Sequence, residues 1–282
     1  MNIAVIGLGL IGGSMAKTLR RHMPHTVLGQ DIDAQVLYKA RLLDAIDGEL
    51  TPQRLAICDM VFIATWPKAA VEYVAEHASE FKPGAMVIDL CGVKRAVCEP
   101  LWKMAGEHGF VFVGGHPMAG IEYSGFSHAT ATLFDNASMI LTPPPGTDIQ
   151  TLAYLKHFFR ELGFGRVVIT TPQEHDRVIA LTSQLAHVVS SAYVKSPLAL
   201  EHLGFSAGSF RDMTRVARLN EDMWTELFLL NREPLTHELD GLIGRLSEYR
   251  DALVSGDETR LRQLLREGRE RKAVVDGKED EP

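Results

Sequence analysis

The feature that most constrains the fold is a run of closely spaced glycines that follows a short apolar segment at the N-terminus. Residues 2–6 are typical of a buried strand, and GLGLIG comes directly after them, before a helical stretch over residues 14–21. Gly7 permits a tight turn, Gly9 lets backbone N–H groups approach a pyrophosphate, and Gly12 lets the helix pack closely against the strand. The pattern therefore predicts a dinucleotide-binding turn.

A carboxylate follows at the position where such folds hold the adenosine ribose. Asp31 lies at the end of a predicted second strand over residues 26–29. It would accept hydrogen bonds from the ribose hydroxyls and repel a 2′-phosphate, so NAD is predicted rather than NADP. The alternative is a tight turn without a ligand, in which Asp31 is an ordinary turn residue. The other residues that we assign to the cofactor are Leu10, Ile11, Thr65 and Gly92.

Short apolar runs alternate with helical segments through the first half of the chain. Further strands are predicted over residues 60–64, 86–90, 111–113 and 139–141. A helix over residues 148–162 and a strand over residues 166–169 follow a proline-rich break. This alternation predicts an α/β fold with a Rossmann-type doubly wound sheet.

The pattern changes near residue 171. Thr171 is a predicted N-cap, Pro172 takes the first helical position, and Glu174 completes a capping box. No strong strand signal follows, and apolar residues recur at helical spacing, notably over residues 224–230 and 235–253. We therefore predict that the second half is all-helical. The charged end, residues 272–282, is expected to fray.

Composition excludes several classes of protein. The 282 residues carry a formal net charge of −7, which argues against a general affinity for nucleic acid or an anionic membrane. The apolar N-terminal segment lacks the basic residues of a signal peptide and is too short to span a bilayer. Cys58, Cys91 and Cys98 form no CxxC pair, which favours a reduced, cytoplasmic compartment.

Three later segments carry chemistry-bearing side chains. In GGHPMAG, His116 follows a predicted strand, so it is expected at the carboxyl edge of the sheet, where ligands of such folds bind. In the helical TSQLAH, Gln184 and His187 are three positions apart and are expected on one face. In GSFRDMTRVA, Arg211 and Arg215 are likewise spaced for one helical face.

Together with GLGLIGGS, LCGVKR and NEDMW, these segments strongly resemble the prephenate/arogenate dehydrogenase family, and the resemblance covers nearly the whole chain. It implies a dinucleotide-binding domain over residues 1–170 and a helical substrate and dimerisation domain over residues 171–282. It also implies a homodimer that converts prephenate and NAD to 4-hydroxyphenylpyruvate, CO₂ and NADH in tyrosine biosynthesis. Whether prephenate or arogenate is preferred stays open, and we expect prephenate.

The resemblance carries site roles to matching positions. His187 is similar to the residue that hydrogen-bonds and polarises the C4 hydroxyl of the substrate, and Arg215 to the anchor of a substrate carboxylate. Arg211 is also assigned to substrate binding. His116 is similar to an active-site neighbour that orients substrate and cofactor. Glu122 falls where some relatives carry an acidic residue that gates the pocket. An imidazole can accept the hydroxyl proton and an arginine can hold a carboxylate in two hydrogen bonds.

Two positions depart from the family pattern. Relatives often carry serine at Gly92 and a histidine at Gln184, so we expect water or the Gln184 amide to replace the lost hydrogen bond. Trp224 is expected either in the neighbouring subunit's site or in the dimer core. No pattern of metal ligands is present. The other nine histidines receive no role: His22, His25, His77, His108, His128, His157, His175, His202 and His237.

Other classes of protein share parts of the pattern. A 3-hydroxyacid dehydrogenase or imine reductase also joins a nucleotide-binding domain to a helical one, but would centre on a catalytic lysine or another acid/base group. Lys195 is the only lysine of the helical core. A non-catalytic NAD-binding sensor would have no reason to place histidine and arginine at the nicotinamide end. No appended regulatory domain is expected.

Overall fold

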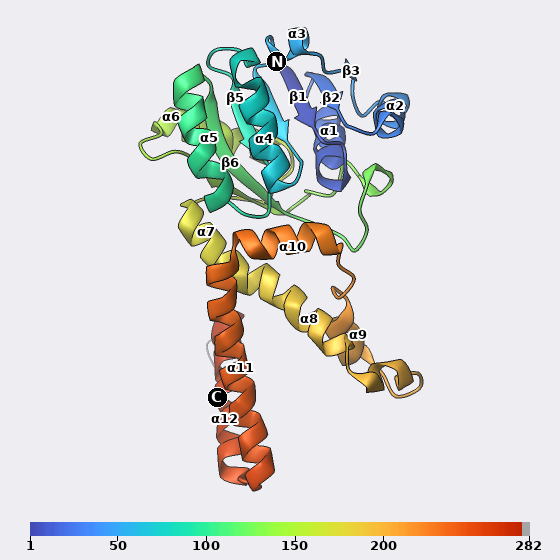
Figure 1. Cartoon of the computed structure of the whole chain (residues 1–282), viewed down its shortest axis with the longest axis vertical. Coiled ribbons are helices and arrows are strands. Elements are labelled where there is room, and N and C mark those ends of the chain that lie inside the picture. The colour runs from blue at the N-terminus through green and yellow to red at the C-terminus, as the bar shows by residue number, and fades with distance from the viewer. Residues whose placement is uncertain (278–282) are drawn as a thin grey trace. The chain divides into compact units, whose positions relative to one another are not determined.

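The computed structural model describes residues 1–277, and its first compact unit is built on an eight-stranded sheet in the order β3-β2-β1-β4-β5-β6-β7-β8 (Figure 1). Neighbouring strands are parallel except β6 and β7, which pair antiparallel. The strands are β1 Asn2–Ile6, β2 Thr26–Gln30, β3 Gly48–Glu49, β4 Met60–Ile63, β5 Met86–Asp89, β6 Val111–Met118, β7 Ser138–Thr142 and β8 Arg166–Ile169. The predicted doubly wound α/β fold is confirmed.

The sheet is buried on both faces because successive residues of a strand point to opposite sides. Ile3 and Val5 of β1 belong to one apolar core, whereas Ala4 and Ile6 belong to the other. The first core is covered by α1 Leu10–His22, α2 Ala34–Leu42 and α6 Ile149–Glu161. The second is covered by α3 Pro52–Leu55, α4 Pro67–His77 and α5 Arg95–His108. Because both faces of the sheet are buried, its strands are continuous apolar runs in the sequence.

Two predicted boundaries in this region were wrong. The helix after the glycine turn begins at Leu10 rather than at residue 14, so Gly12 lies within the helix. The predicted strand over residues 111–113 extends to Met118. Glycine and proline usually weaken a strand, but here β7 supplies antiparallel partners along GGHPM. His116 therefore lies within β6 and not after it.

Within residues 171–277 the regular elements are all helices, as predicted. The first compact unit, residues 1–232, contains α7 Pro172–Ile179, a π-helix over Ala180–Leu185, α8 Ala186–Val194, α9 Gly208–Thr214 and α10 Glu221–Leu230. The Thr171 hydroxyl accepts the N–H of Glu174 at 3.2 Å, which confirms the predicted N-cap. The Glu174 carboxylate is bound by Arg177. Short 3₁₀ segments occupy Ala78–Glu80, Phe126–His128 and Pro197–Glu201.

The second compact unit begins at residue 233, and its described part, residues 233–277, is a helical hairpin. Its helices are α11, Arg232–Ser255, and α12, Glu258–Val275, and the Tyr249 hydroxyl of one donates to the Leu264 carbonyl of the other at 3.2 Å. The expectation that the chain frays from residue 272 was wrong for residues 272–275, which continue α12. Residues 278–282 lie outside the described part. The units divide at residue 232, whereas the sequence places a functional boundary at residue 170.

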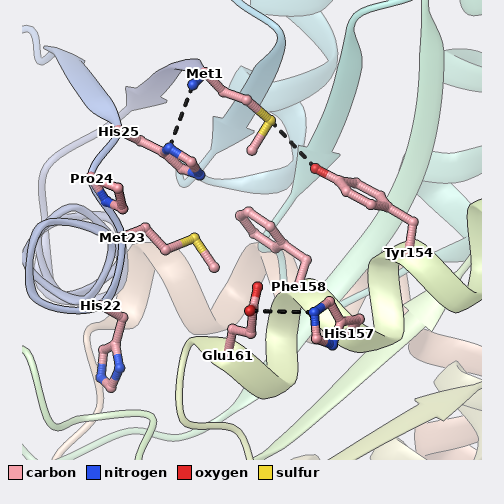
Figure 2. A pocket seen from close by; sticks show the side chains of 9 residues that line it. All are labelled: Met1, His22, Met23, Pro24, His25, Tyr154, His157, Phe158 and Glu161. Carbon is pink, nitrogen blue, oxygen red and sulfur yellow. Dashed lines mark hydrogen bonds and ion pairs between the residues drawn. The ribbon is translucent and has the colours of Figure 1, made fainter.

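A cleft of about 370 Å³ lies at the amino edge of the sheet, where β1 and β2 begin (Figure 2). It is lined by Met1, His22, Met23, Pro24, His25, Tyr154, His157, Phe158 and Glu161. The glycine turn follows β1 at the opposite edge. This cleft is therefore separate from the predicted site.

Candidate active site

The glycine turn has the geometry that a dinucleotide requires. Gly7 adopts a φ of +81°, in the left-handed region that favours glycine. A Cβ on Gly12 would lie 1.8 Å from the Gly7 carbonyl oxygen, so only glycine allows this approach. A Cβ on Gly9, the N-cap of α1, would meet open space. Leu10 and Ile11 begin the first turn of the helix, whose N–H groups lack partners within the helix and attract an anion.

Asp31 faces this turn from the end of β2. Its Oδ2 accepts the N–H of Leu8 at 2.7 Å, and its Oδ1 accepts the N–H of Asp33 at 2.9 Å. Each carboxylate oxygen has a second lone pair, which is free to accept a hydroxyl. The carboxylate therefore both braces the glycine turn and presents acceptors beside it.

The ends of β4 and β5 continue the same edge of the sheet. Thr65 follows β4 and packs against the glycine turn, because its Cγ2 would lie 2.9 Å from a Cβ on Gly7. Gly92 follows β5, and a Cβ there would lie 3.4 Å from Leu227 Cδ2 of α10. The structure thus brings Thr65 to the glycine turn and places Gly92 under α10.

Helix α10 joins this edge to α8. The Glu226 carboxylate accepts the N–H of Lys68 at the start of α4, at 2.8 Å. Two residues earlier in the same helix, the Trp224 ring lies against His187, with 4.0 Å between ring centroids. Figure 1 shows α10 between the carboxyl edge of the sheet and α8. The helix therefore sets His187 at a fixed distance from the cofactor edge.

His187 is held as a neutral hydrogen-bond acceptor. Its Nδ1 lies 3.1 Å from the carbonyl oxygen of Val216, which only accepts, so Nδ1 carries the proton and Nε2 is bare. Burial lowers the pKa of His187; the Val216 hydrogen bond acts the other way, and the charge of Arg215 lowers the pKa further. Arg215 is the C-cap of α9 and is exposed. The structure thus brings the predicted histidine and arginine together.

Gln184 is turned into the protein. It lies in the π-helix Ala180–Leu185, where the wider turn changes the spacing of faces that an α-helix would give. Its Oε1 accepts from Asn231 Nδ2 at 2.7 Å, and its Nε2 donates to the Leu227 carbonyl at 3.3 Å. The buried amide is therefore engaged at both ends by other parts of the chain, whereas His187 is only partly buried.

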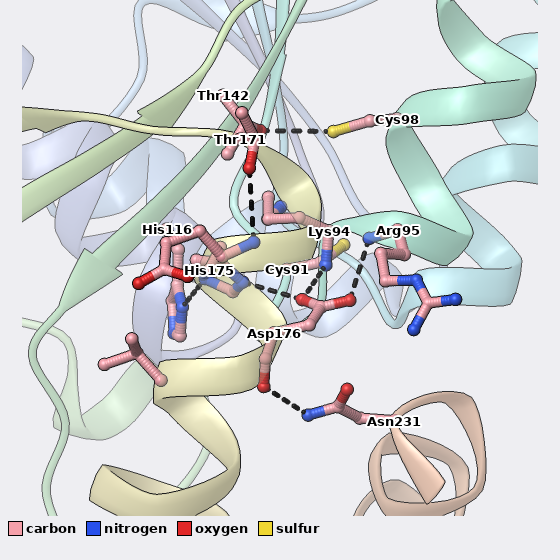
Figure 3. Close-up of polar contacts among 12 residues, drawn as sticks. Cys91, Lys94, Arg95, Cys98, His116, Thr142, Thr171, His175, Asp176 and Asn231 are labelled. Carbon is pink, nitrogen blue, oxygen red and sulfur yellow. Dashed lines mark hydrogen bonds and ion pairs between the residues drawn. The ribbon is translucent and has the colours of Figure 1, made fainter. Parts of the chain in front are cut away.

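A second histidine site lies on β6 and α7 (Figure 3). His116 Nδ1 is 2.8 Å from His175 Nε2, and His175 Nδ1 is 2.7 Å from Asp176 Oδ1. The Asp176 carboxylate also accepts the backbone N–H groups of Lys94 at 2.7 Å and Arg95 at 2.9 Å. His175 and Asp176 are buried, whereas His116 is partly exposed. A continuous row of hydrogen bonds therefore leads from a buried carboxylate to an accessible imidazole.

Burial keeps both imidazoles neutral. It lowers the pKa of His116 well below 6.5, and His175 and Lys94 lower it further. Burial also lowers the pKa of His175, although the hydrogen bond to Asp176 acts the other way. Lys94 is completely buried against Asp89; burial opposes its charge, but Asp89 together with Cys91 and Cys98 outweighs burial, and the pKa of Lys94 is raised. The site therefore combines neutral histidines with a compensated buried ion pair.

Comparison with known proteins accounts for this arrangement. Residues 15–170 match the family described as "Prephenate dehydrogenase, nucleotide-binding domain", and residues 171–267 match "Prephenate dehydrogenase, dimerization domain". The chain belongs to the prephenate dehydrogenase family. The resemblance inferred from GGHPMAG and GSFRDMTRVA is confirmed, and so is the prediction of a nucleotide-dependent oxidoreductase.

Individual family members are similar over almost their full length. The cyclohexadienyl dehydrogenase of Zymomonas mobilis is 32% identical, over 97% of this chain and 96% of its own. The Aquifex aeolicus prephenate dehydrogenase, solved with hydroxyphenyl propionate and NAD⁺, has a TM-score of 0.83 and 29% identity, over 98% of both chains. The arogenate dehydrogenase of Synechocystis has a TM-score of 0.81 and 28% identity, over 98% of this chain and all of its own.

Two residues that the sequence assigns to the prephenate dehydrogenase site remain apart from its hydrogen bonds. Glu122 is exposed in the loop after β6, and Arg211 is exposed on α9. Within residues 1–277, neither side chain has a hydrogen bond or ion pair. Arg211 lies one turn before Arg215, so it remains on the same side of α9.

The sequence analysis missed the buried end of the histidine row. His175 received no role, and Asp176 and Lys94 were not singled out. A signal was present, since His175 and Asp176 adjoin near the start of the helix that Thr171 caps, and Lys94 comes soon after a buried strand. The contact to His116, however, joins residues that are 59 positions apart, and local periodicity does not reveal it.

Two absences hold for residues 1–277 of this prephenate dehydrogenase family member. No group of three or more His, Cys, Asp or Glu residues is placed to hold a metal ion. No helix is long and apolar enough to cross a membrane.

Proposed function

We propose that this protein is an NAD-dependent prephenate dehydrogenase that converts prephenate to 4-hydroxyphenylpyruvate and CO₂ in tyrosine biosynthesis. The observation that carries the proposal is His116, a neutral imidazole whose Nδ1 is bound to His175, so that Nε2 is a bare acceptor. It lies toward the carboxyl end of β6, on the edge of the sheet that also carries the glycine turn. A proton acceptor beside a nicotinamide site is what oxidation of a secondary alcohol requires.

The glycine turn fits the cofactor. The open space at Gly9 and the N–H groups of Leu10 and Ile11 would hold the pyrophosphate, and Asp31 would hold the ribose hydroxyls and disfavour a 2′-phosphate. Thr65 and Gly92 would line the path toward the nicotinamide. NAD, when bound, supplies the acceptor for the hydride that leaves C4 of the substrate.

His116 manages the hydroxyl proton of the substrate. As the C4–H bond breaks, the attached oxygen gains carbonyl character, and its proton becomes acidic enough for a weakly basic imidazole to accept at Nε2. The bond to the ring carboxylate then breaks, CO₂ leaves, and its electron pair completes the aromatic ring. The proton returns to the oxygen of the phenol. The sequence assigns this step to His187. We assign it to His116 because the Asp176 carboxylate stands behind His116 through His175, whereas His187 is backed only by the neutral Val216 carbonyl.

His187, Arg215 and Arg211 form the substrate side of the proposed site. The Arg215 guanidinium would hold a substrate carboxylate in two hydrogen bonds, and Nε2 of His187 would accept from a substrate hydroxyl. Arg211 would supply a second positive charge one turn away, and Glu122 would gate the entrance. Gln184 would support the site indirectly, because its hydrogen bond with Asn231 holds the π-helix in place.

Assembly and location are also part of the proposal. We infer a homodimer, since residues 171–267 match a dimerisation domain and several large apolar side chains of the 3₁₀ segment Pro197–Glu201 and the loop after it are exposed. Functionally, residues 1–170 would bind the cofactor and residues 171–282 would bind substrate and partner. A cytoplasmic location is supported by three cysteines that are all free and buried.

The deciding experiment measures NADH formation by the purified protein with prephenate, arogenate and a generic 3-hydroxyacid in parallel. We expect the highest kcat/KM with prephenate and NAD, and 4-hydroxyphenylpyruvate as the product. Arogenate is the second candidate, supported by the similarity to the Synechocystis enzyme. His116→Asn should lower kcat by about 10²-fold or more, because an amide cannot take up the proton.

Two results would overturn the proposal. Turnover of only the 3-hydroxyacid would assign the protein to another substrate class, and a fully active His116→Asn variant would remove the proton acceptor. Binding of NAD by that variant serves as the control for folding of the cofactor site.

A further inference from the structure

We propose that His175 is a positioning residue which, backed by Asp176, fixes His116 in the one tautomer that can accept a proton from the substrate. This inference rests on the proposed function, and it adds two buried residues to the reaction that never touch the substrate. The geometry that carries it is the row of hydrogen bonds from Asp176 through His175 to His116 (Figure 3).

The proton positions along the row follow from its buried end. The Asp176 carboxylate only accepts, so the ring nitrogen that faces it, His175 Nδ1 at 2.7 Å, must carry a proton. A neutral His175 then has a bare Nε2. The facing nitrogen, His116 Nδ1 at 2.8 Å, must therefore donate, which leaves His116 Nε2 without a proton. One carboxylate thus determines the tautomers of two imidazoles.

The buried end of the row is itself held rigidly. Asp176 Oδ1 accepts the N–H of Lys94 and Oδ2 accepts the N–H of Arg95, both at the start of α5. The Asp176 carbonyl accepts from Asn231 at 2.8 Å, and the His175 N–H donates to the Thr171 carbonyl at 2.9 Å. The carboxylate therefore keeps two backbone donors when His175 is replaced. Replacement of His175 can therefore release the tautomer of His116 without leaving the buried Asp176 carboxylate unpaired.

Burial favours a neutral His175, because its side chain is completely buried. The nearby charge of Lys94 also lowers the pKa of His175, whereas Asp176 and Asp89 act the other way. Asp176 on the same helix supplies the nearest negative charge, and His116 on β6 is the neighbour across the row. When His116 takes up the substrate proton, its Nδ1–H donates more strongly to His175, and Asp176 stabilises the charge through that ring. The row therefore orients the acceptor first and stabilises its charged form afterwards.

Two replacements of His175 separate positioning from mere structural support. His175→Leu removes the acceptor for His116 Nδ1, so we expect kcat to fall by about 10²-fold or more while KM for prephenate and NAD changes little. His175→Gln offers an amide oxygen at the same place, and we expect it to recover about tenfold in kcat, the value of one hydrogen bond. His157→Gln, at an exposed histidine of α6, is the matched control and should keep full activity.

The decisive readout needs no substrate. In protein labelled with ¹⁵N-histidine, the His116 signals, identified by their loss in His116→Asn, should show protonated Nδ1 and bare Nε2 in the unmodified protein and in His175→Gln. His175→Leu should show a mixture of tautomers or the opposite one. A His116 tautomer that is unchanged in His175→Leu, or equal loss of melting temperature, NAD affinity and kcat in both variants, would overturn the inference. Failure of the proposed function would appear instead as no turnover of prephenate by the unmodified protein.

Discussion

At the scale of single residues, His116 and His187 reach the same electronic state through different partners. Each donates from Nδ1 and keeps Nε2 bare, but His116 donates to a second imidazole and His187 to the carbonyl of Val216. A carboxylate stands behind the first histidine, whereas the Arg215 charge acts on the second. The first is thus suited to carry a positive charge for a moment, and the second to bind as a neutral group.

Arg215 should govern affinity for the substrate more than the chemical step. Arg215→Ala should raise KM for prephenate with a smaller effect on kcat, because one partner of a charge-assisted pair is lost. The increase in KM should correspond to a loss on the order of 2–4 kcal/mol in the free energy of binding. Arg215→Lys should fall between, since an ammonium cannot reproduce the fork. The Arg215 charge lowers the pKa of His187, so its removal should raise that pKa in an NMR titration.

The control for this prediction lies one turn away. Arg211→Ala removes an exposed positive charge from the same helix without touching the His187 pair. Equal increases in KM for the two alanine variants would show a general electrostatic attraction and would remove Arg215 from its role as the specific anchor.

At the scale of elements, two glycines of the glycine turn are expected to have different roles: Gly12 in stability and Gly9 in NAD binding. Gly12→Ala would place a Cβ 1.8 Å from the Gly7 carbonyl oxygen, so it should lower the free energy of unfolding by about 3 kcal/mol or more. Gly9→Ala meets no atom of the described chain, so stability should change by less than about 0.5 kcal/mol. Its Cβ stands where the pyrophosphate must approach, and NAD affinity should fall by about tenfold or more.

Thermal melts and NAD titrations of both glycine variants test this separation. A stable Gly12→Ala protein would show that α1 can move away from β1 at little cost. A Gly9→Ala protein with normal NAD affinity would place the pyrophosphate elsewhere.

The same scale explains what the sequence could predict. The order of strands and helices, the glycine turn and the Thr171 cap follow from local patterns, because each depends on residues close together in the chain. The length of β6 does not, since its second half exists only through pairing with β7. The π-helix and the contact of His116 with His175 depend equally on tertiary packing. Elements were therefore predictable, whereas the hydrogen bonds that tune the histidines required the fold.

At the scale of the whole molecule, one segment of the helical half exposes several large apolar side chains to solvent. Between Ser196 and Ala207, four large apolar side chains are strongly exposed: Leu198 at 72%, Leu200 at 89%, Leu203 at 80% and Phe205 at 93%. Several large apolar side chains exposed within one short segment are typical of an interaction site. The segment lies inside the match to the dimerisation domain. We therefore expect it to pack against a second copy of the chain.

Charge introduced at this segment should dissociate the dimer. Leu200→Asp combined with Phe205→Asp would bury two carboxylates at an apolar contact, so size-exclusion chromatography with light scattering should show monomers. Ile149→Asp is the matched control, because Ile149 is equally exposed at 77% but lies in α6, outside the dimerisation match, where an acid at a helix start is favourable. If the double variant and the control elute alike as dimers, the contact between copies lies on another surface. A monomer that still binds NAD with normal affinity would show that the cofactor half is complete within one chain, because every residue assigned to the cofactor precedes residue 171.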